Sequence, residues 1–287
     1  MKNITKIGFL SLFVFITNIS IWAQSEGDFQ VTLTADNRGV VIARYTGTIR
    51  EVVIPATIQG MPVREIGYDA FVDPLVGFSR VDRRITRIII PEGVTKIGSQ
   101  AFRALNSLVS ITLPSTLIEI GSSAFADLPL LTSIELPAGL RVIGSNAFSR
   151  CILLTSISLP SGLTEIGANA FEGSALSVFP NPWPVGVTTI QARMFENTNL
   201  TSVVIPEGIT FIGSSAFARC RSLTRITLPS TINTIDTNAF ANSSITSIEI
   251  PETVTSIRYG YGAFQYLSRL NLASQARIRE LNYSDRF

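Results

Sequence analysis

The sequence contains no histidine, and only two cysteines and 15% charged residues among its 287 residues. Without histidine there is no Ser-His or Cys-His nucleophile pair, and no imidazole can act as a general base near neutral pH. The same absence removes most zinc sites. A hydrophobic fraction of 46% excludes a disordered chain. The composition therefore favours a folded protein with few groups suited to catalysis.

The first 23 residues have the pattern of an export signal. Lys2 and Lys6 precede an apolar run over residues 7–22, and the small residue Ala23 follows it. This order predicts a secretory signal peptide that is cleaved near Ala23. A membrane anchor is the alternative, but the run is short for a bilayer span and polar residues weaken its end. The residue directly after the predicted cleavage site is Gln24 rather than cysteine, which disfavours a lipoprotein.

The mature chain is formally neutral. The sequence has 23 basic and 21 acidic residues, and removing Lys2 and Lys6 leaves 21 of each. A nucleic-acid-binding protein concentrates positive charge, so we expect no nucleic-acid partner. No second apolar run approaches the length of a membrane span. We expect a soluble protein that is secreted, exposed at the cell surface or held in the periplasm.

Internal repetition is the strongest signal in the sequence. Prolines recur every 22 to 24 residues at Pro91, Pro114, Pro137, Pro160, Pro184, Pro206, Pro229 and Pro251. A phenylalanine series runs through Phe71, Phe102, Phe125, Phe148, Phe171, Phe195, Phe217, Phe240 and Phe264. Alanine precedes every one of these except Phe195. Because the two series stay in phase, the chain is built from nine copies of one unit.

The unit is illustrated by residues 131–153, LTSIELPAGLRVIGSNAFSRCIL. Its opening alternation predicts a strand with Glu135 pointing outward and its apolar neighbours inward. Pro137 ends this strand because proline cannot donate to a ladder. Ser145 is placed to cap a short helical turn that carries Phe148. No single unit can bury its apolar face, whereas stacked units share one continuous core.

The predicted fold is a leucine-rich-repeat solenoid of the α/β type, mostly β, with about nine repeats of 23 residues. Parallel strands lie on one face, and turns and short helical segments lie on the other. At one strand spacing per repeat, the stack is about 40 Å long, with the phenylalanines stacked inside. The predicted divisions are a signal peptide over 1–23, an N-terminal β cap over 24–48, the repeats over 49–272 and a C-terminal cap over 273–287. Within the first cap, residues 28–45 alternate around the turn DNRG and predict a β-hairpin.

The units LVSITLPSTLIEIGSSAFADL and LTRITLPSTINTIDTNAFANS resemble the BspA-like, treponema-type leucine-rich repeats of bacterial surface and secreted proteins. The resemblance covers about residues 49–272, and its I-x-L-P and I-G-x-x-A-F motifs are specific. It implies the solenoid fold strongly and function only loosely, because such repeats are interaction scaffolds with many partners. Host extracellular-matrix proteins and bacterial-surface proteins are the partners that it implies.

Three repeats depart from the pattern. Residues 72–84 contain extra residues whose apolar side chains either contact a ligand or fold back on the first repeat. The segment PNPWP, 180–184, puts Trp183 in the slot of a core leucine, so we favour a core position over a ligand site. We expect Pro182 to interrupt strand pairing and bend the stack. The segment RYGYG, 258–262, lengthens one turn.

The two cysteines occupy equivalent slots. Cys151 and Cys220 each lie three residues after a repeat phenylalanine. Three repeats separate them by about 14 Å along the axis, whereas a disulfide needs Cα atoms within about 7 Å. We expect two buried, reduced thiols.

The sequence contains no phosphate-binding loop, dinucleotide fingerprint or cysteine pair with metal spacing, so we expect no cofactor and no metal. Glu119 and Glu165 share a slot two repeats apart, at about 10 Å. That separation lies just outside the window of inverting glycosidases. Repeat copying explains these glutamates without catalysis, and we expect no enzyme.

The outward strand face is the candidate binding surface. A central column and a flanking threonine column make it weakly charged and rich in hydroxyl groups. The residues are Thr86, Ile89, Thr112, Thr132, Glu135, Thr155, Ser158, Thr201, Val204, Thr224, Thr227, Thr246 and Glu249. Threonine and serine also simply suit a parallel ladder. Both interpretations stand, because solenoid faces commonly bind partners.

We therefore expect a secreted or surface, non-catalytic and monomeric binding protein. Its partner is a protein or a glycan, and its role is protein–protein interaction or adhesion to host matrix or other cells. The alternative is a periplasmic or envelope structural scaffold with no host ligand. A hydrolase is a third hypothesis, which an activity panel would test.

Overall fold

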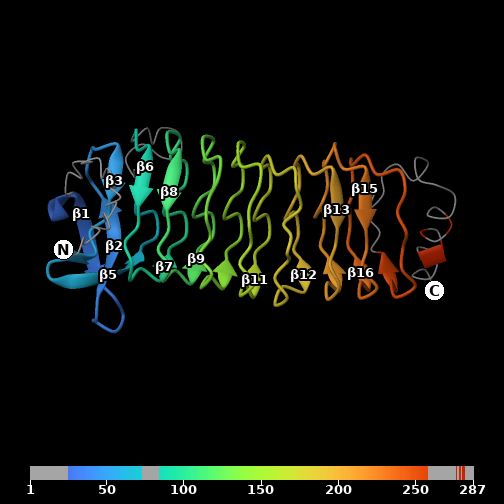
Figure 1. The fold of residues 1–287 in the computed structure, drawn as a ribbon, viewed down its shortest axis with the longest axis horizontal. Coiled ribbons are helices and arrows are strands. Elements are labelled where there is room, and N and C mark those ends of the chain that lie inside the picture. The colour runs from blue at the N-terminus through green and yellow to red at the C-terminus, as the bar shows by residue number, and fades with distance from the viewer. Residues whose placement is uncertain (1–24, 73–83, 258–275, 277, 279, 282–287) are drawn as a thin grey trace, which may run out of the picture.

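The protein is a solenoid that coils once for each sequence repeat. A computed structural model describes residues 25–72, 84–257, 276, 278, 280 and 281. Figure 1 shows the coils following one another in chain order along a single long axis. This confirms the predicted repeat architecture of about 23 residues per turn.

The first wall of each coil contains the segment equivalent to residues 131–136, and we call it the strand wall. Its paired strands are β3 (Glu51–Val53), β6 (Arg87–Ile89), β8 (Ser110–Thr112), β13 (Ser202–Val204) and β15 (Arg225–Thr227). β3, β6 and β8 form one parallel sheet, and β13 and β15 form another. Segments 131–136 and 154–159 lie between the two sheets and are not paired as strands. The predicted parallel strands are thus found towards both ends of the wall but not in its middle.

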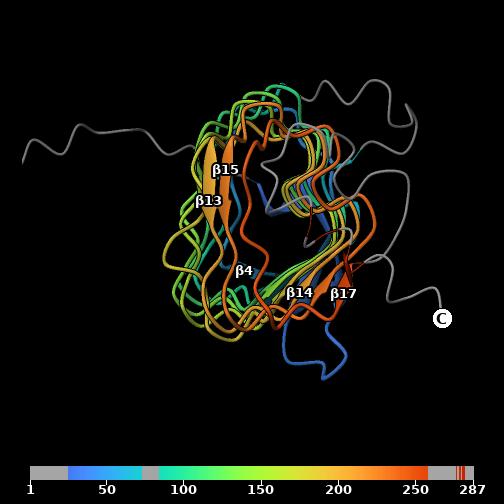
Figure 2. The same ribbon diagram turned by 90° about the vertical axis from the view of Figure 1, so that its right-hand side faces the viewer.

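The second wall was not predicted as a sheet. It contains the two residues before the turn glycine of most repeats, a slot that Gln191, Asp236 and Arg258 fill in the others, and we call it the ladder wall. Its strands are β5 (Met61–Ile66), β7 (Lys96–Ile97), β9 (Glu119–Ile120), β10 (Val142–Ile143), β11 (Glu165–Ile166), β12 (Thr189–Ile190), β14 (Phe211–Ile212), β16 (Thr234–Ile235) and β17 (Ser256–Ile257). They pair in parallel and in chain order, with an interruption between β11 and β12. Viewed along the axis, β13 and β15 lie on one side of the coil and β14 and β17 on another (Figure 2).

The third wall contains the phenylalanine turns, and we call it the turn wall. The short helical turn predicted after Ser145 is wrong, because Asn146 and Arg150 have positive φ values of 58°. A left-handed residue at these two places stops a helix and redirects successive N–H groups. The N–H of Phe148 donates to Ala170 of the next repeat at 2.8 Å, while that of Ala147 donates back to Gly144 at 3.3 Å. The turn wall is therefore a third hydrogen-bonded ladder between repeats.

The phenylalanine column forms the centre of the core, as predicted. Ring centroids of consecutive members from Phe71 to Phe240 lie between 4.9 and 5.9 Å apart, and all of these rings are buried. Tyr45 and Phe29 extend the column into the N-terminal cap, with centroids 5.1 Å from Phe71 to Tyr45 and 5.3 Å from Tyr45 to Phe29. The cap therefore continues the same stack of rings rather than forming a separate core.

The predicted hairpin over 28–45 is confirmed. After the 3₁₀ turn η1 (Glu26–Asp28), β1 (Phe29–Leu33) pairs antiparallel with β2 (Val40–Tyr45). β2 in turn pairs in parallel with β5, which also pairs with the short β4 (Thr57–Ile58). The hairpin thus covers the first edge of the ladder wall.

Several predicted segments lie outside the described residues: the signal peptide, most of the 72–84 insertion and the 258–262 turn. Of the predicted C-terminal cap, the structure describes only 276, 278, 280 and 281, which are helical. Across the described ranges, no helix is both long and apolar enough to cross a bilayer.

Candidate binding surface

The strand wall carries every residue of the predicted binding surface. Thr86 and Ile89 are half-buried, and the other members are exposed. Strand register puts Ile89 beside Thr112 and Val204 beside Thr227. Where the wall is paired, the members of the central column in successive repeats therefore lie side by side. Where it is not paired, only the order of the repeats places them next to one another.

Hydroxyl groups of the threonine column are used within the scaffold itself. The Thr224 hydroxyl donates to the backbone oxygen of Thr201 at 3.4 Å, and the N–H of Thr224 donates to the same oxygen at 3.1 Å. The Thr86 hydroxyl donates to the backbone oxygen of Arg50 at 3.4 Å. These contacts support the structural interpretation of the column, because a hydroxyl that links two repeats is less available to a ligand.

The middle of the strand wall has free backbone groups. Within the described chain, no backbone hydrogen bond joins residues 132–136 to a neighbouring repeat, and a single one, from Ser177 N to Thr155 O at 3.1 Å, involves residues 155–159. Exposed N–H and C=O groups here are left to water or to a partner. The sequence carries no signal of this gap, since LTSIELP at 131–137 matches its paired equivalents.

Exposed aliphatic side chains follow one another along and beside this gap, and we call them the apolar patch; sequence reasoning missed most of them. Its members are Leu130, Ile152, Leu153, Val178 and Val204, with exposed fractions of 42, 56, 44, 64 and 68%. Only Val204 belongs to the predicted surface. The sequence does contain a signal for two members of the patch, in the position just before the first leucine of each repeat. That position is polar in other repeats, as in Ser107, Asn199 and Ser222, but it is leucine at 130 and 153.

Trp183 lies in the core, as predicted. It is 9% exposed, its ring stacks on Phe179 with centroids 5.3 Å apart, and its Nε1 donates to the backbone oxygen of Val187 at 2.8 Å. Strand pairing is absent at the repeat of Pro182, as predicted, but it is also absent at 131–136 and 154–159, which contain no proline. The interruption between β11 and β12 does coincide with this repeat. The irregular segment thus anchors its ring inside and leaves Val178 exposed on the wall.

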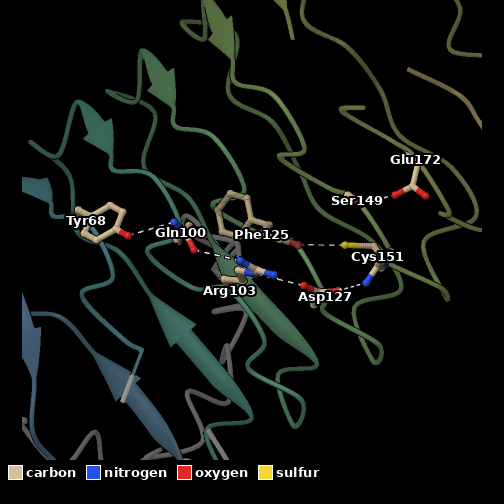
Figure 3. A network of polar contacts seen from close by, with 9 residues as sticks. Tyr68, Gln100, Arg103, Phe125, Asp127, Ser149, Cys151 and Glu172 are labelled. Carbon is tan, nitrogen blue, oxygen red and sulfur yellow. Dashed lines mark hydrogen bonds and ion pairs between the residues drawn. The ribbon is translucent and has the colours of Figure 1, made fainter. Parts of the chain in front are cut away.

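The turn wall carries a polar network across several repeats (Figure 3). Gln100 Nε2 donates to the Tyr68 hydroxyl at 3.2 Å, and Arg103 Nη1 donates to Gln100 Oε1 at 3.1 Å. Asp127 then pairs with Arg103 at 3.1 Å and with Arg150 at 3.6 Å. Arg193, Glu196 and Arg219 repeat the arrangement further along, at 3.6 and 3.7 Å. Most of these ion pairs join neighbouring repeats, while Arg193 and Glu196 pair within one turn. The network is therefore better suited to holding the stack than to binding a charged ligand.

A second set of contacts between repeats was missed from the sequence. Glu92 accepts hydrogen bonds from the N–H and the hydroxyl of Ser115, each at 2.9 Å. Glu207 does the same with Ser230, at 2.9 and 3.0 Å. The bond from the Ser115 N–H, followed by that from its hydroxyl, holds the pKa of Glu92 below its usual value. The sequence pattern that could have predicted these contacts is P-E-G followed one repeat later by P-S-T. It occurs at 91–93 with 114–116 and at 206–208 with 229–231.

Both cysteines are free and buried, in equivalent environments. Cys151 Sγ donates to the backbone oxygen of Phe125, and Cys220 Sγ to that of Phe195, each at 3.1 Å. Burial raises the pKa of the Cys151 thiol to about 12 and also raises the pKa of Cys220. Neither is placed to act as a nucleophile, because the thiolate is the reactive form.

The carboxylates of the ladder wall do not form an acid pair. Register puts Val142 between Glu119 and Glu165, which confirms their separation by two repeats. Glu119 instead pairs with Lys96 at 2.9 Å. Among the described residues, no group of three or more acidic or cysteine side chains could hold a metal ion.

The fold and the wall define a repeat scaffold of the leucine-rich class, and comparison with known proteins identifies the family. The model of the BspA type leucine rich repeat region matches residues 78–185 and 188–282, with six copies. Because these ranges cover more than half of the sequence, the chain belongs to the BspA-type leucine-rich repeat family. No curated protein sequence matches it.

Several solved structures of bacterial proteins are similar to this chain. A leucine rich repeat protein of T. pallidum is 28% identical with a TM-score of 0.54, over 90% of this chain and 95% of that one. A leucine rich cell surface protein of Faecalibacterium prausnitzii A2-165 is 26% identical with a TM-score of 0.40, over 82% and 84%. The pneumococcal vaccine antigen PcpA is 21% identical with a TM-score of 0.48, over 80% and 75%. The first of these supports the solenoid fold over nearly the whole chain.

Proposed function

We propose that this chain is a secreted or surface-exposed, non-catalytic protein that binds another protein through its strand wall. The observation that carries the proposal is the apolar patch, which exposes aliphatic side chains beside free backbone groups in the middle of the wall. Exposed apolar clusters with a polar surround are typical of protein contact sites. Membership of a family of interaction scaffolds supports the same function.

A protein partner suits the wall better than a glycan. Sugars pack their C–H faces on aromatic rings, and the large exposed apolar side chains of the described strand wall are aliphatic. The exposed leucines and valines, Leu130, Leu153, Val178 and Val204, favour contact with the side chains of another protein. Host extracellular-matrix and bacterial-surface proteins are the partners we propose, which would make the role adhesion.

An envelope scaffold is the second candidate, and the threonine contacts favour it. If the hydroxyls of Thr86 and Thr224 serve only to join repeats, the column needs no ligand. Cell fractionation separates the two functions, because a protein retained in the periplasm cannot contact a host. The predicted signal peptide is compatible with both.

The test is direct binding of purified residues 24–287 to immobilised fibronectin and fibrinogen, with a glycan array for comparison. We expect saturable binding to a protein, weakened at least tenfold by Val178→Asp. Val185→Asp is the matched control, because Val185 is 91% exposed but lies in the turn after Pro184. No binding at micromolar protein would exclude adhesion to these matrix proteins.

A further inference from the structure

Two opposite charges on the strand wall lie on either side of an uncharged centre. Glu135 and Arg225 are exposed on the wall and lie four repeats apart, about 19 Å at one strand spacing per repeat. The outward positions between them carry no charge: Thr155, Ser156, Ser158, Ser177, Val178, Thr201, Ser202 and Val204. Val178 belongs to the repeat midway between the two charges.

Neither charge has a partner within the described chain. Ion pairs join Lys96 to Glu119 on the ladder wall and several residues of the turn wall, but none involves Glu135 or Arg225. Their separation of about 19 Å also prevents them from pairing with each other. Glu135 and Arg225 therefore lie unpaired at matched distances from the Val178 repeat. The other exposed charges of the described wall lie outside the interval between them, among them Glu51 and Arg87 before Glu135, and Glu249 one repeat beyond Arg225.

This arrangement is self-complementary. A two-fold axis that runs along the strand direction through the Val178 repeat turns the solenoid end for end. It places the repeat of Glu135 in one copy opposite the repeat of Arg225 in the other, so this contact occurs once on each side of the axis. An isologous interface requires this kind of match, since each contact occurs twice. The two charges sit on diagonal rather than directly opposed positions, which long side chains can bridge.

The apolar centre of the wall suits the same interface. Val178 and Val204 are 64 and 68% exposed, so two copies of the patch would remove aliphatic surface from water. The wall from Ser110 to Ser247 is about 30 Å long and about 20 Å across, a footprint of about 600 Å² per copy. Stable interfaces bury about 800 Å² per partner, so the dimer would need the whole of this wall together with residues at its edges.

We propose that the strand wall is the interface of a symmetric homodimer, in which Val178 packs near the two-fold axis and Glu135 of each copy pairs with Arg225 of the other. This departs from the monomer expected from the sequence. The proposal shares the wall with the proposed function, and a ligand bound there would have to displace the second copy. Its test uses no ligand, so the two proposals fail independently.

The experiment is sedimentation equilibrium of residues 24–287 from about 1 to 100 µM. We expect a dimer whose dissociation constant rises at least tenfold in Glu135→Arg and in Arg225→Glu, since each change creates two like-charge contacts. The double variant Glu135→Arg/Arg225→Glu should return to within about threefold of the unmodified chain. Because the two residues cannot meet within one chain, such rescue can arise only between copies.

The remaining variants fix the position of the interface. Val178→Asp should weaken the dimer at least tenfold, while Val185→Asp should leave it unchanged, and circular dichroism should show the same fold in all. A monomer at 100 µM would overturn the proposal. Single variants that dimerise normally, or a double variant that fails to recover, would also overturn it.

Discussion

At the scale of single residues, the turn wall requires a left-handed backbone at two places in each turn. Asn146 and Asn169 suit this conformation, which asparagine adopts more readily than most residues. Ala104 has a φ of 56° at the second of the two places, which Arg150 occupies in a later repeat. Alanine has no polar side chain that could stabilise the left-handed conformation. The chain therefore gives up stability at this position that a glycine would not.

Replacing Ala104 with glycine should stabilise the protein. The left-handed conformation costs alanine about 1–2 kcal/mol, and glycine's greater freedom when unfolded offsets part of the gain. We expect Ala104→Gly to raise the free energy of unfolding by about 0.5–1 kcal/mol, as measured by urea denaturation. Ala101→Gly is the control in the same turn. Its methyl group is buried and its φ is not positive, so it should lose stability.

The buried thiol of Cys151 should make stability depend on pH in the alkaline range. Burial raises its pKa from the usual 9.0 to about 12, so the folded state holds the proton more tightly than the unfolded state. The resulting stability is present in full below about pH 9 and is lost as the pH rises towards 12. Denaturation of Cys151→Ala between pH 7 and 11 should show a shallower alkaline loss than the unmodified chain. An equal loss in both would contradict the burial of the thiol.

At the scale of elements, glycines allow the strands of the ladder wall to approach closely. A Cβ on Gly144 would lie 2.6 Å from Ser122 N and 2.7 Å from the carbonyl carbon of Gly121. Asp236 occupies the same slot in a later repeat, and its N–H still donates to Ile212 at 2.8 Å. A side chain can therefore be accommodated there if the neighbouring backbone shifts.

That shift should be costly in the middle of the stack, where β9, β10 and β11 are paired without interruption. We expect Gly144→Ala to lower the free energy of unfolding by about 1–3 kcal/mol, the usual cost of overpacking. Gly27→Ala is the control, because its Cβ would meet nothing closer than Ser25 Oγ at 3.4 Å. A change in Gly144→Ala as small as that in the control would show that the repeats are free to move apart.

Elements were predictable from the sequence to different degrees. The repeat length and the core could be predicted from the phenylalanine series, because a large apolar ring that recurs once in each repeat is buried at the same position in every coil. The ladder wall was missed because strands of two residues, such as Val142–Ile143, show no alternation. A helix was predicted after Ser145 because arginine, unlike glycine or asparagine, does not indicate a left-handed backbone, and Arg150 adopts one there. For the candidate surface, the outward columns were found, while Leu130 and Leu153 lay outside the strand pattern.

At the scale of the whole molecule, the solenoid is divided at one level. The ladder wall is interrupted between β11 and β12, and the paired strands of the strand wall fall into one set before this level and one after it. The turn wall and the ring column cross it. Phe171 and Phe195 have centroids 5.5 Å apart, and the N–H of Phe171 donates to Met194 at 3.0 Å. Coupling between the two halves therefore depends mainly on this part of the core.

Removing the Phe171 ring should separate the unfolding of the two halves. Repeat proteins are stabilised by contacts between neighbours, so a weak junction can split one transition into two. Phe171→Ala should cost about 3–5 kcal/mol, as should Phe125→Ala, whose ring is equally buried. Phe125 lies where β9 and β10 are paired, so its variant should keep a single transition.

Trp183 provides the measurement, because the sequence has two tryptophans and the other, Trp22, leaves with the predicted signal peptide. Its ring packs among Phe179 and Phe195, so its fluorescence reports on the second half, while circular dichroism reports on the whole chain. In urea, the two signals should give different midpoints for Phe171→Ala and one midpoint for Phe125→Ala. Coincident midpoints in Phe171→Ala would mean that the halves remain coupled through contacts other than the ring column.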